Sequence, residues 1–180
     1  MDKQKLETLL DSLESELAER KENLSSSVRT EICKAICAFC NDLPNHKEPG
    51  YIFVGVKNEG TPVGLRNPEN DLLSLANIRS EGNILPFPRM NVSMVALKGT
   101  DVLVVEVLPS LEPPVRFNGI TWIRVGSRKA RATQEEERRL SEKQLASVRF
   151  LSLAQGLPTT AGLLFIGKDP QFRIPGAYIQ

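Results

Sequence analysis

The sequence lacks long hydrophobic runs, a disulfide framework and an excess of either charge. It has no window of 18 uninterrupted apolar residues, and residues 1–21 are charged throughout, which excludes a membrane span and a secretory signal. Its 3 cysteines lie together at positions 33, 37 and 40, an odd number that suits a reducing compartment. We therefore expect a cytoplasmic protein without a membrane segment.

Charge is almost balanced over the whole chain. The 23 Lys and Arg residues nearly cancel the 22 Asp and Glu residues, which leaves a net charge of +1. Any attraction to nucleic acid therefore has to come from a local basic patch.

Length and composition favour one globular domain with a short appendage. The chain has 180 residues, of which 41% are hydrophobic and 25% charged, enough to bury a core. We expect a domain at residues 1–150 and the start of a following segment at residues 151–180. The last strand pattern stops at the final residue, so we expect that this segment is truncated.

Hydrophobic spacing predicts an α+β fold. We expect helices at residues 2–18, 27–41, 70–79 and 134–145, and strands at residues 51–56, 62–65, 92–97, 102–108, 120–125, 162–167 and 176–180. These elements predict one compact domain with a mixed or mostly antiparallel sheet of about five to seven strands. The helices are expected mainly on one face of the sheet.

A stretch late in the chain contains cations and no acid. Between Pro113 and Thr133 it contains Arg116, Arg124, Arg128, Lys129 and Arg131. Held on a strand and loop, these side chains could follow a phosphate backbone without reading sequence. Gly126 and Ser127 could add backbone N–H groups for a phosphate. The alternative is a solvated surface whose charges pair with the acidic residues 135–137.

Three separated segments carry a family resemblance. The first is Glu14–Lys21, which is similar to an E-S-x-x-x-E-F-K signature with Arg20 in place of the aromatic. The second combines Ile36–Asn41 with Ile52–Val56 and Gly60–Leu65. The third is Pro113–Glu137, which contains the sequence R-V-G-S. Together they resemble the Schlafen-type, Alba-like DNA-binding domain of bacterial regulators, and they occur in order over about residues 14–140.

The resemblance implies a nucleic-acid-binding module. Such a module would be the N-terminal part of a bacterial transcriptional regulator or ATP-binding protein, bind phosphates through the cations and Ser127, and need no cofactor. The choice between DNA and RNA stays open, and so does the role of the loop Leu43–Pro49, where many relatives have a short turn.

The same resemblance implies a rival function, a metal-dependent nuclease acting on RNA or DNA. In eukaryotic Schlafen nucleases two acids of the first motif and a third acid hold a divalent metal, which here implies Mg²⁺ or Mn²⁺ on Glu14, Glu19 and Glu59. Lys21 would offset charge on the leaving oxygen. The family's third acid falls near Lys57 or Asn58, so this chain departs from the pattern there.

Geometry sets a condition on that site. Residues five apart are about 140° apart around an α-helix, so Glu14 and Glu19 converge only if the helix ends near Ser15 and the chain becomes extended. In an extended segment Glu19 and Lys21 share a face.

A third hypothesis is a dimerisation or docking domain. An amphipathic stripe near the N-terminus could pair with a second copy or cover a downstream domain, and it consists of Leu6, Leu9, Leu10, Leu13 and Leu17.

Three further motifs are better interpreted as structural. Cys33, Cys37 and Cys40 match an iron–sulfur spacing, but they lie within a helical pattern where Cys is commonly buried. His46 could be the fourth ligand of a zinc site with these cysteines, but a lone histidine in a polar loop is more often only solvated. Residues 162–168 resemble a phosphate loop without its Lys-Ser/Thr ending.

Overall fold

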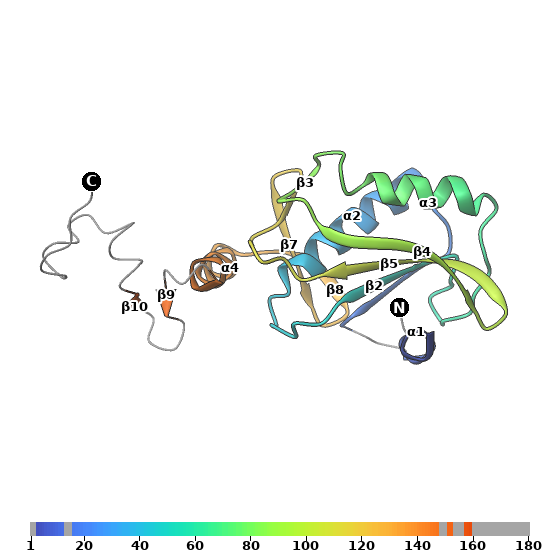
Figure 1. Ribbon diagram of the computed structural model, residues 1–180, viewed down its shortest axis with the longest axis horizontal. Helices are drawn as coiled ribbons and strands as arrows, with labels where there is room; N and C mark the ends of the chain where they lie inside the picture. The colour runs from blue at the N-terminus through green and yellow to red at the C-terminus, as the bar shows by residue number, and fades with distance from the viewer. Residues whose placement is uncertain (1–2, 13–15, 148–150, 153–156, 160–180) are drawn as a thin grey trace, which may run out of the picture. The chain divides into compact units, whose positions relative to one another are not determined.

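A computed structural model of the chain describes residues 3–12, 16–147, 151–152 and 157–159 (Figure 1). These residues belong to two units. The first comprises Met1–Ser110 with Val115–Ala132, and the second comprises Leu111–Pro114 with Thr133–Gln180. The described residues contain no helix long and apolar enough to cross a membrane.

The first sheet of the first unit is mixed, as predicted. Its strands lie in the order β1 (Ala18–Lys21), β2 (Gly50–Val54), β5 (Thr100–Leu108) and β4 (Arg89–Leu97). β1 and β2 are parallel, and a parallel pair needs a crossover, which is supplied by helix α2 (Ser26–Asn41). β4 and β5 form the predicted hairpin.

Helices cover both faces of this sheet (Figure 1). On one face, α2 and α3 (Pro68–Asn77) pack over Ile52, Val54 and neighbouring apolar side chains. On the other face, α1 (Lys3–Asp11) buries Leu6 and Leu10 against Phe53. Leu6 and Leu10 are 1% and 0% exposed. These two leucines are part of the chain's own core and cannot also pair with a second copy.

Helix α1 is shorter than predicted, and strand β1 begins at Ala18, the last residue of the predicted helix. Helix α1 ends at Asp11, and Leu17 lies just before β1. The Arg20 guanidinium donates hydrogen bonds to the carbonyl oxygens of Leu9 and Leu10, each at 3.0 Å, and to that of Ser12. Arg20 therefore satisfies carbonyl groups that a helix end leaves without partners.

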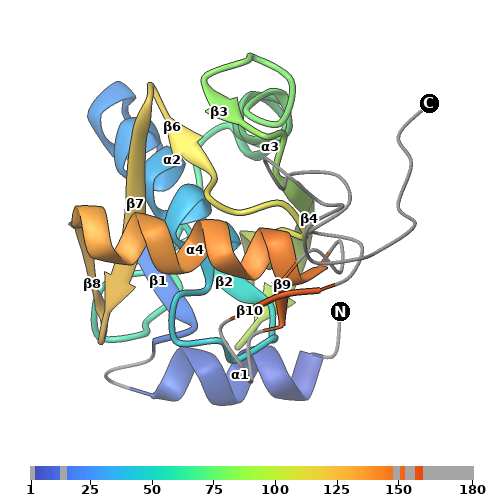
Figure 2. The same cartoon turned by 90° about the vertical axis from the view of Figure 1, so that its left-hand side faces the viewer.

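A second, antiparallel sheet lies beside α2 (Figure 2). Its order is β3 (Ile84–Leu85), β6 (Arg116–Phe117), β7 (Ile120–Val125) and β8 (Arg128–Arg131). Asn118 and Gly119 connect β6 to β7 with φ values of 49° and 77°, the conformation of a tight hairpin turn. The α+β class is thus confirmed, with the strands of this unit divided between two sheets of four.

The second unit contains helix α4 (Gln134–Ser147) and a short antiparallel pair, β9 (Leu151–Ser152) with β10 (Leu157–Pro158). Thr133 caps α4 as predicted, because its Oγ1 accepts from the Glu136 N–H at 3.3 Å and its own N–H donates to Glu136 Oε2 at 2.8 Å. The strands predicted at residues 162–167 and 176–180 lie outside the described residues.

One buried amide joins α2 to the second sheet. The Asn41 Nδ2 group donates to the carbonyl oxygens of Val115 at 3.0 Å and Trp122 at 2.7 Å, and its Oδ1 accepts from the Val115 N–H at 2.7 Å. The residue is 2% exposed, so water cannot replace these bonds.

We expect the substitution Asn41→Ala to lower the free energy of unfolding by about 3 kcal/mol, because the Val115 N–H and the Trp122 carbonyl oxygen lose the amide partner they have in a buried place, while the Val115 carbonyl oxygen keeps only the weak Cys37 thiol donor. The control is Asn70→Ala, an exposed position in α3, with a change below about 0.5 kcal/mol. Urea unfolding of both variants measures the difference, and equal stability of the two would contradict this role of Asn41.

Candidate functional site

A single carboxylate on β1 contacts three cations. Glu19 Oε2 accepts a hydrogen bond from Arg124 Nη1 at 3.0 Å. Glu19 Oε1 lies 2.5 Å from Lys129 Nζ and 2.9 Å from Lys21 Nζ. We call these four residues the Glu19 cluster. The exposed fractions of the Glu19 and Arg124 side chains are only 11% and 5%, so the ion pairs are largely shielded from water.

Strand geometry brings these groups together. Side chains alternate along β1, so Glu19 and Lys21 share the face of Ile52 and Val54 under α2, which confirms the face predicted for an extended segment. On the second sheet, Arg124 of β7 lies directly opposite Lys129 of β8. Residues directly opposite in an antiparallel pair also share a face. The cluster therefore links the two sheets.

Arg124 is held from several sides. Its Nη2 donates to the carbonyl oxygen of Ser127 at 2.7 Å, and its guanidinium carbon lies 4.9 Å from the centre of the Phe39 ring. With 6% exposure, this residue is a structural cation of the core.

The cluster continues across α2 to a wider basic surface. Glu31 lies 3.6 Å from Lys129 and 2.6 Å from Lys34. Lys34 and Arg131 lie over the Trp122 ring, at 4.9 Å and 5.8 Å from its centre. We call the combined set the basic face: Glu19, Lys21, Glu31, Lys34, Arg124, Lys129 and Arg131. Its five cations against two carboxylates leave a surplus of positive charge.

The cations keep both carboxylates ionised. Burial alone would raise the pKa of Glu19. Hydrogen bonds and charge from Lys129 and Lys21 together lower it by more than burial raises it, so the resulting pKa is about 2 against an ordinary 4.5. The hydrogen bond from Lys34 likewise lowers the pKa of Glu31.

The acid-free stretch does not act as one group. Lys129 and Arg131 share the face of Arg124, whereas Arg128 lies opposite Val125 on the other face of the β7–β8 hairpin. Arg116 lies opposite Thr121 and so shares the face of Arg128. Ser127 is exposed in the turn between the strands.

Two of the acidic residues 135–137 have partners within their own segment. Glu135 pairs with Arg138 at 2.6 Å within α4, and Glu136 is the capping partner of Thr133. Arg124 and Lys129 pair with Glu19, the residue expected to be a metal ligand.

The proposed metal ligands do not form a site among the residues described. Glu14 lies outside them. Glu59 is exposed. The carbonyl oxygen of its neighbour Asn58 accepts a hydrogen bond from Arg20 at 3.4 Å. Arg20 points to the α1 side of the sheet, whereas Glu19 points to the other side. No group of three or more His, Cys, Asp or Glu residues in the described part could hold a metal. A divalent cation at Glu19 would have to displace three cations, so the environment of Glu19 does not fit the metal.

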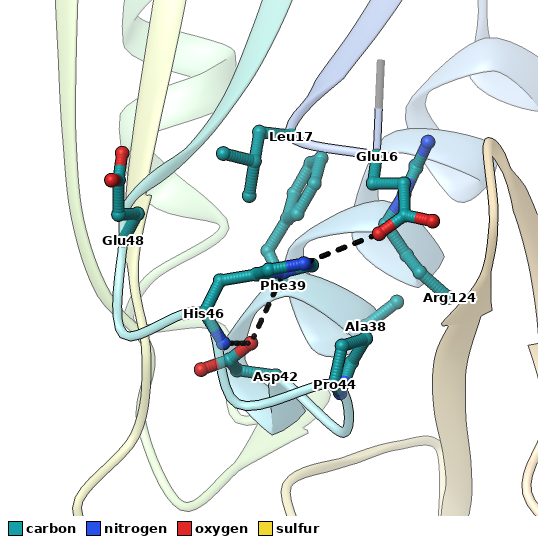
Figure 3. A pocket seen from close by; sticks show the side chains of 9 residues that line it. All are labelled: Glu16, Leu17, Ala38, Phe39, Asp42, Pro44, His46, Glu48 and Arg124. Atoms are coloured by element: carbon teal, nitrogen blue, oxygen red, sulfur yellow. Dashed lines mark hydrogen bonds and ion pairs between the residues drawn. The ribbon is translucent and has the colours of Figure 1, made fainter. Parts of the chain in front are cut away.

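The three cysteines and the histidine have structural environments. Burial raises the pKa of the Cys33 and Cys37 thiols to about 11, and it also raises that of Cys40. His46 Nε2 lies 3.2 Å from Glu16, and its Nδ1 lies 3.7 Å from Asp42 (Figure 3).

The pocket beside His46 is too small for a substrate. Its volume of about 20 Å³ holds roughly one water molecule. Leu17, Phe39 and Arg124 are among the side chains that line it (Figure 3).

Comparisons with known proteins agree with this architecture. The sequence model of the family described as Schlafen, AlbA_2 matches residues 14–133. The chain is similar to the N-terminal domain of an ATP-dependent DNA helicase RecG-related protein from Nitrosomonas europaea, with a TM-score of 0.51 and 23% identity over 73% of this chain and 92% of that chain.

A second similar structure is the DIP2311 protein from Corynebacterium diphtheriae, with a TM-score of 0.54 and 17% identity over 82% of this chain and 32% of that chain. At these identities the two structures show the fold alone. No curated protein sequence is significantly similar to the chain.

We expect Glu19→Gln to lower the free energy of unfolding by about 3 kcal/mol at neutral pH, because it leaves the surrounding cations without their counter-ion. A lowered pKa means that the stabilisation is complete above the ordinary value of 4.5 and is lost as the pH falls toward about 2. The difference from the wild type should therefore shrink across that window.

Urea unfolding at pH 7, 4.5 and 2.5 measures this dependence. Glu59→Gln, at an exposed carboxylate, is the control and should behave like the wild type. A Glu19→Gln deficit that is absent at pH 7, or equally large at every pH, would contradict the assignment of Glu19 as a buried counter-ion.

Proposed function

The chain belongs to the Schlafen, AlbA_2 family, and on that premise we propose that it is a nucleic-acid-binding module that contacts phosphates through the basic face. It would serve as the N-terminal part of a bacterial, cytoplasmic transcriptional regulator or ATP-binding protein. The fold shared with a domain of a helicase-related protein supports an association with nucleic acid. The module binds its ligand and is not itself an enzyme.

One observation carries this proposal: Glu19 holds three cations within 3.0 Å and neutralises only part of their charge. Like charges so close together would repel one another without a counter-ion. The basic face therefore presents a concentrated positive surplus on a chain whose net charge is only +1. Phosphates respond to such local charge, and their counterions are released on binding.

The cations divide into two roles. Arg124 and Lys129 are buried against Glu19, with side chains 5% and 12% exposed, and they set the field and geometry of the face. Lys34, with 25% exposure, and the exposed Arg131 supply direct phosphate contacts. Ser127 extends the contact at the exposed turn of the hairpin, whereas Arg128 lies on the other face and is not part of it.

We expect the double variant Lys34→Ala/Arg131→Ala to bind single- and double-stranded DNA and RNA about tenfold more weakly. The plot of log affinity against log salt should become shallower by about 2, because two phosphate contacts are lost. Fluorescence anisotropy of labelled oligonucleotides over a range of salt concentrations measures both quantities.

The matched control is Arg79→Ala/Lys98→Ala, which removes the same charge from exposed positions on α3's C-terminal side and the β4–β5 turn. Equal losses in the two double variants would mean that only net charge matters, and the basic face would then not be the binding surface.

A further inference from the structure

A groove beside β6 differs in character from the basic face. Leu85 and Pro86 give it an apolar side, Asn83 and Asn118 contribute amides, and Arg116 contributes a guanidinium. Its volume is about 430 Å³, which lies in the range of small-ligand sites. A space of this size accommodates one nucleotide, and no step of the proposed phosphate binding uses it.

Backbone pairing holds the walls of the groove in place. β3 pairs with β6 so that Leu85 lies directly opposite Arg116, and the two side chains share a face. The Asn118 N–H donates to the Asn83 carbonyl oxygen at 2.8 Å, which ties the β6–β7 turn to the segment before β3. The apolar, amide and cationic groups are thus positioned by strands rather than by a free loop.

Apolar side chains at this edge are exposed. Leu85 is 52% exposed, and Phe87, two residues further along, is 60% exposed. The other phenylalanines in the described part of the chain, Phe39, Phe53 and Phe117, are buried. Phe87 is not one of the residues that line the groove, but it follows Leu85 closely in the chain, and Leu85 lies opposite the Arg116 guanidinium. Exposed apolar side chains near a guanidinium are typical of a surface that contacts a partner with both a flat apolar part and a negative charge.

We propose that this groove binds an unpaired nucleotide of a single-stranded nucleic acid, a proposal that rests on the proposed function. The base packs on Leu85 and Phe87, the amides of Asn83 and Asn118 reach its hydrogen-bonding edge, and Arg116 contacts the adjoining phosphate. Bases stacked inside a duplex cannot reach such a groove. The groove therefore gives the module a preference for single strands, while the basic face contacts phosphates of either form.

The test compares a single-stranded oligonucleotide with its duplex, by anisotropy, for the full chain. Leu85→Ala/Phe87→Ala should weaken single-strand binding about tenfold and duplex binding less than twofold, with the salt slope unchanged because no charge is lost. The matched control is Leu73→Ala at an apolar position of α3 that is 59% exposed. It should leave both affinities as in the wild type.

A second variant probes the groove without removing apolar surface. Arg116→Gln should weaken single-strand binding and lower its salt slope by about 1, whereas Arg79→Gln at an exposed arginine should not. This variant keeps the proposal testable if the double alanine variant unfolds.

The outcomes separate the two proposals. Equal effects of the groove variants on single strand and duplex, or no effect on either, overturn the groove while the basic face stands. Loss of single-strand binding in the groove variants with normal binding by Lys34→Ala/Arg131→Ala supports the groove and contradicts the basic face. A wild-type chain that binds no nucleic acid overturns both.

Discussion

A carboxylate buried among three cations is the interaction on which this structure depends. Glu19 comes from the first sheet, Arg124 and Lys129 come from the second, and the ion pairs cross between them. Removing the carboxylate would leave like charges facing one another where water screens them poorly. The same interaction that joins the sheets therefore also concentrates the cations, so stability and electrostatic character have one origin.

The short strand β1 serves both faces of its sheet. Arg20 points to the α1 side and satisfies the carbonyl oxygens at the end of that helix, while Glu19 and Lys21 point to the α2 side and build the basic face. Alternation along four residues thus couples the folding of the N-terminal helix to the geometry of the binding surface. A similar division on the second sheet places Arg131 and Arg116 on opposite faces, so the two proposed contacts would use different surfaces.

Local signals predicted helices α2, α3 and α4 and the longer strands β2, β4, β5 and β7, because helix periodicity, capping residues and strand alternation act within a few residues. The short strands β1, β3, β6 and β8 were not predicted. The helix through Asn41, the hairpin of β4 and β5, and the Thr133 cap follow from such signals. The role of Glu19 could not be found in this way, because its partner Arg124 is 105 residues away. Asn118–Gly119 is a hairpin signal that would have set the register of β6 and β7. That register and the pairing of β7 with β8 together place Arg116 and Arg131 on opposite faces.

The measurement that tests the central claim most directly is a carbon-13 NMR titration of the Glu19 side-chain carboxyl, without and with Mn²⁺. A carboxylate held by Lys129 and Lys21 should titrate with a pKa of about 2, and its carbon-13 signal should stay sharp when the metal is added. An ordinary pKa near 4.5, or selective broadening of this signal by Mn²⁺ at low concentration, would contradict the account and identify Glu19 as a metal ligand.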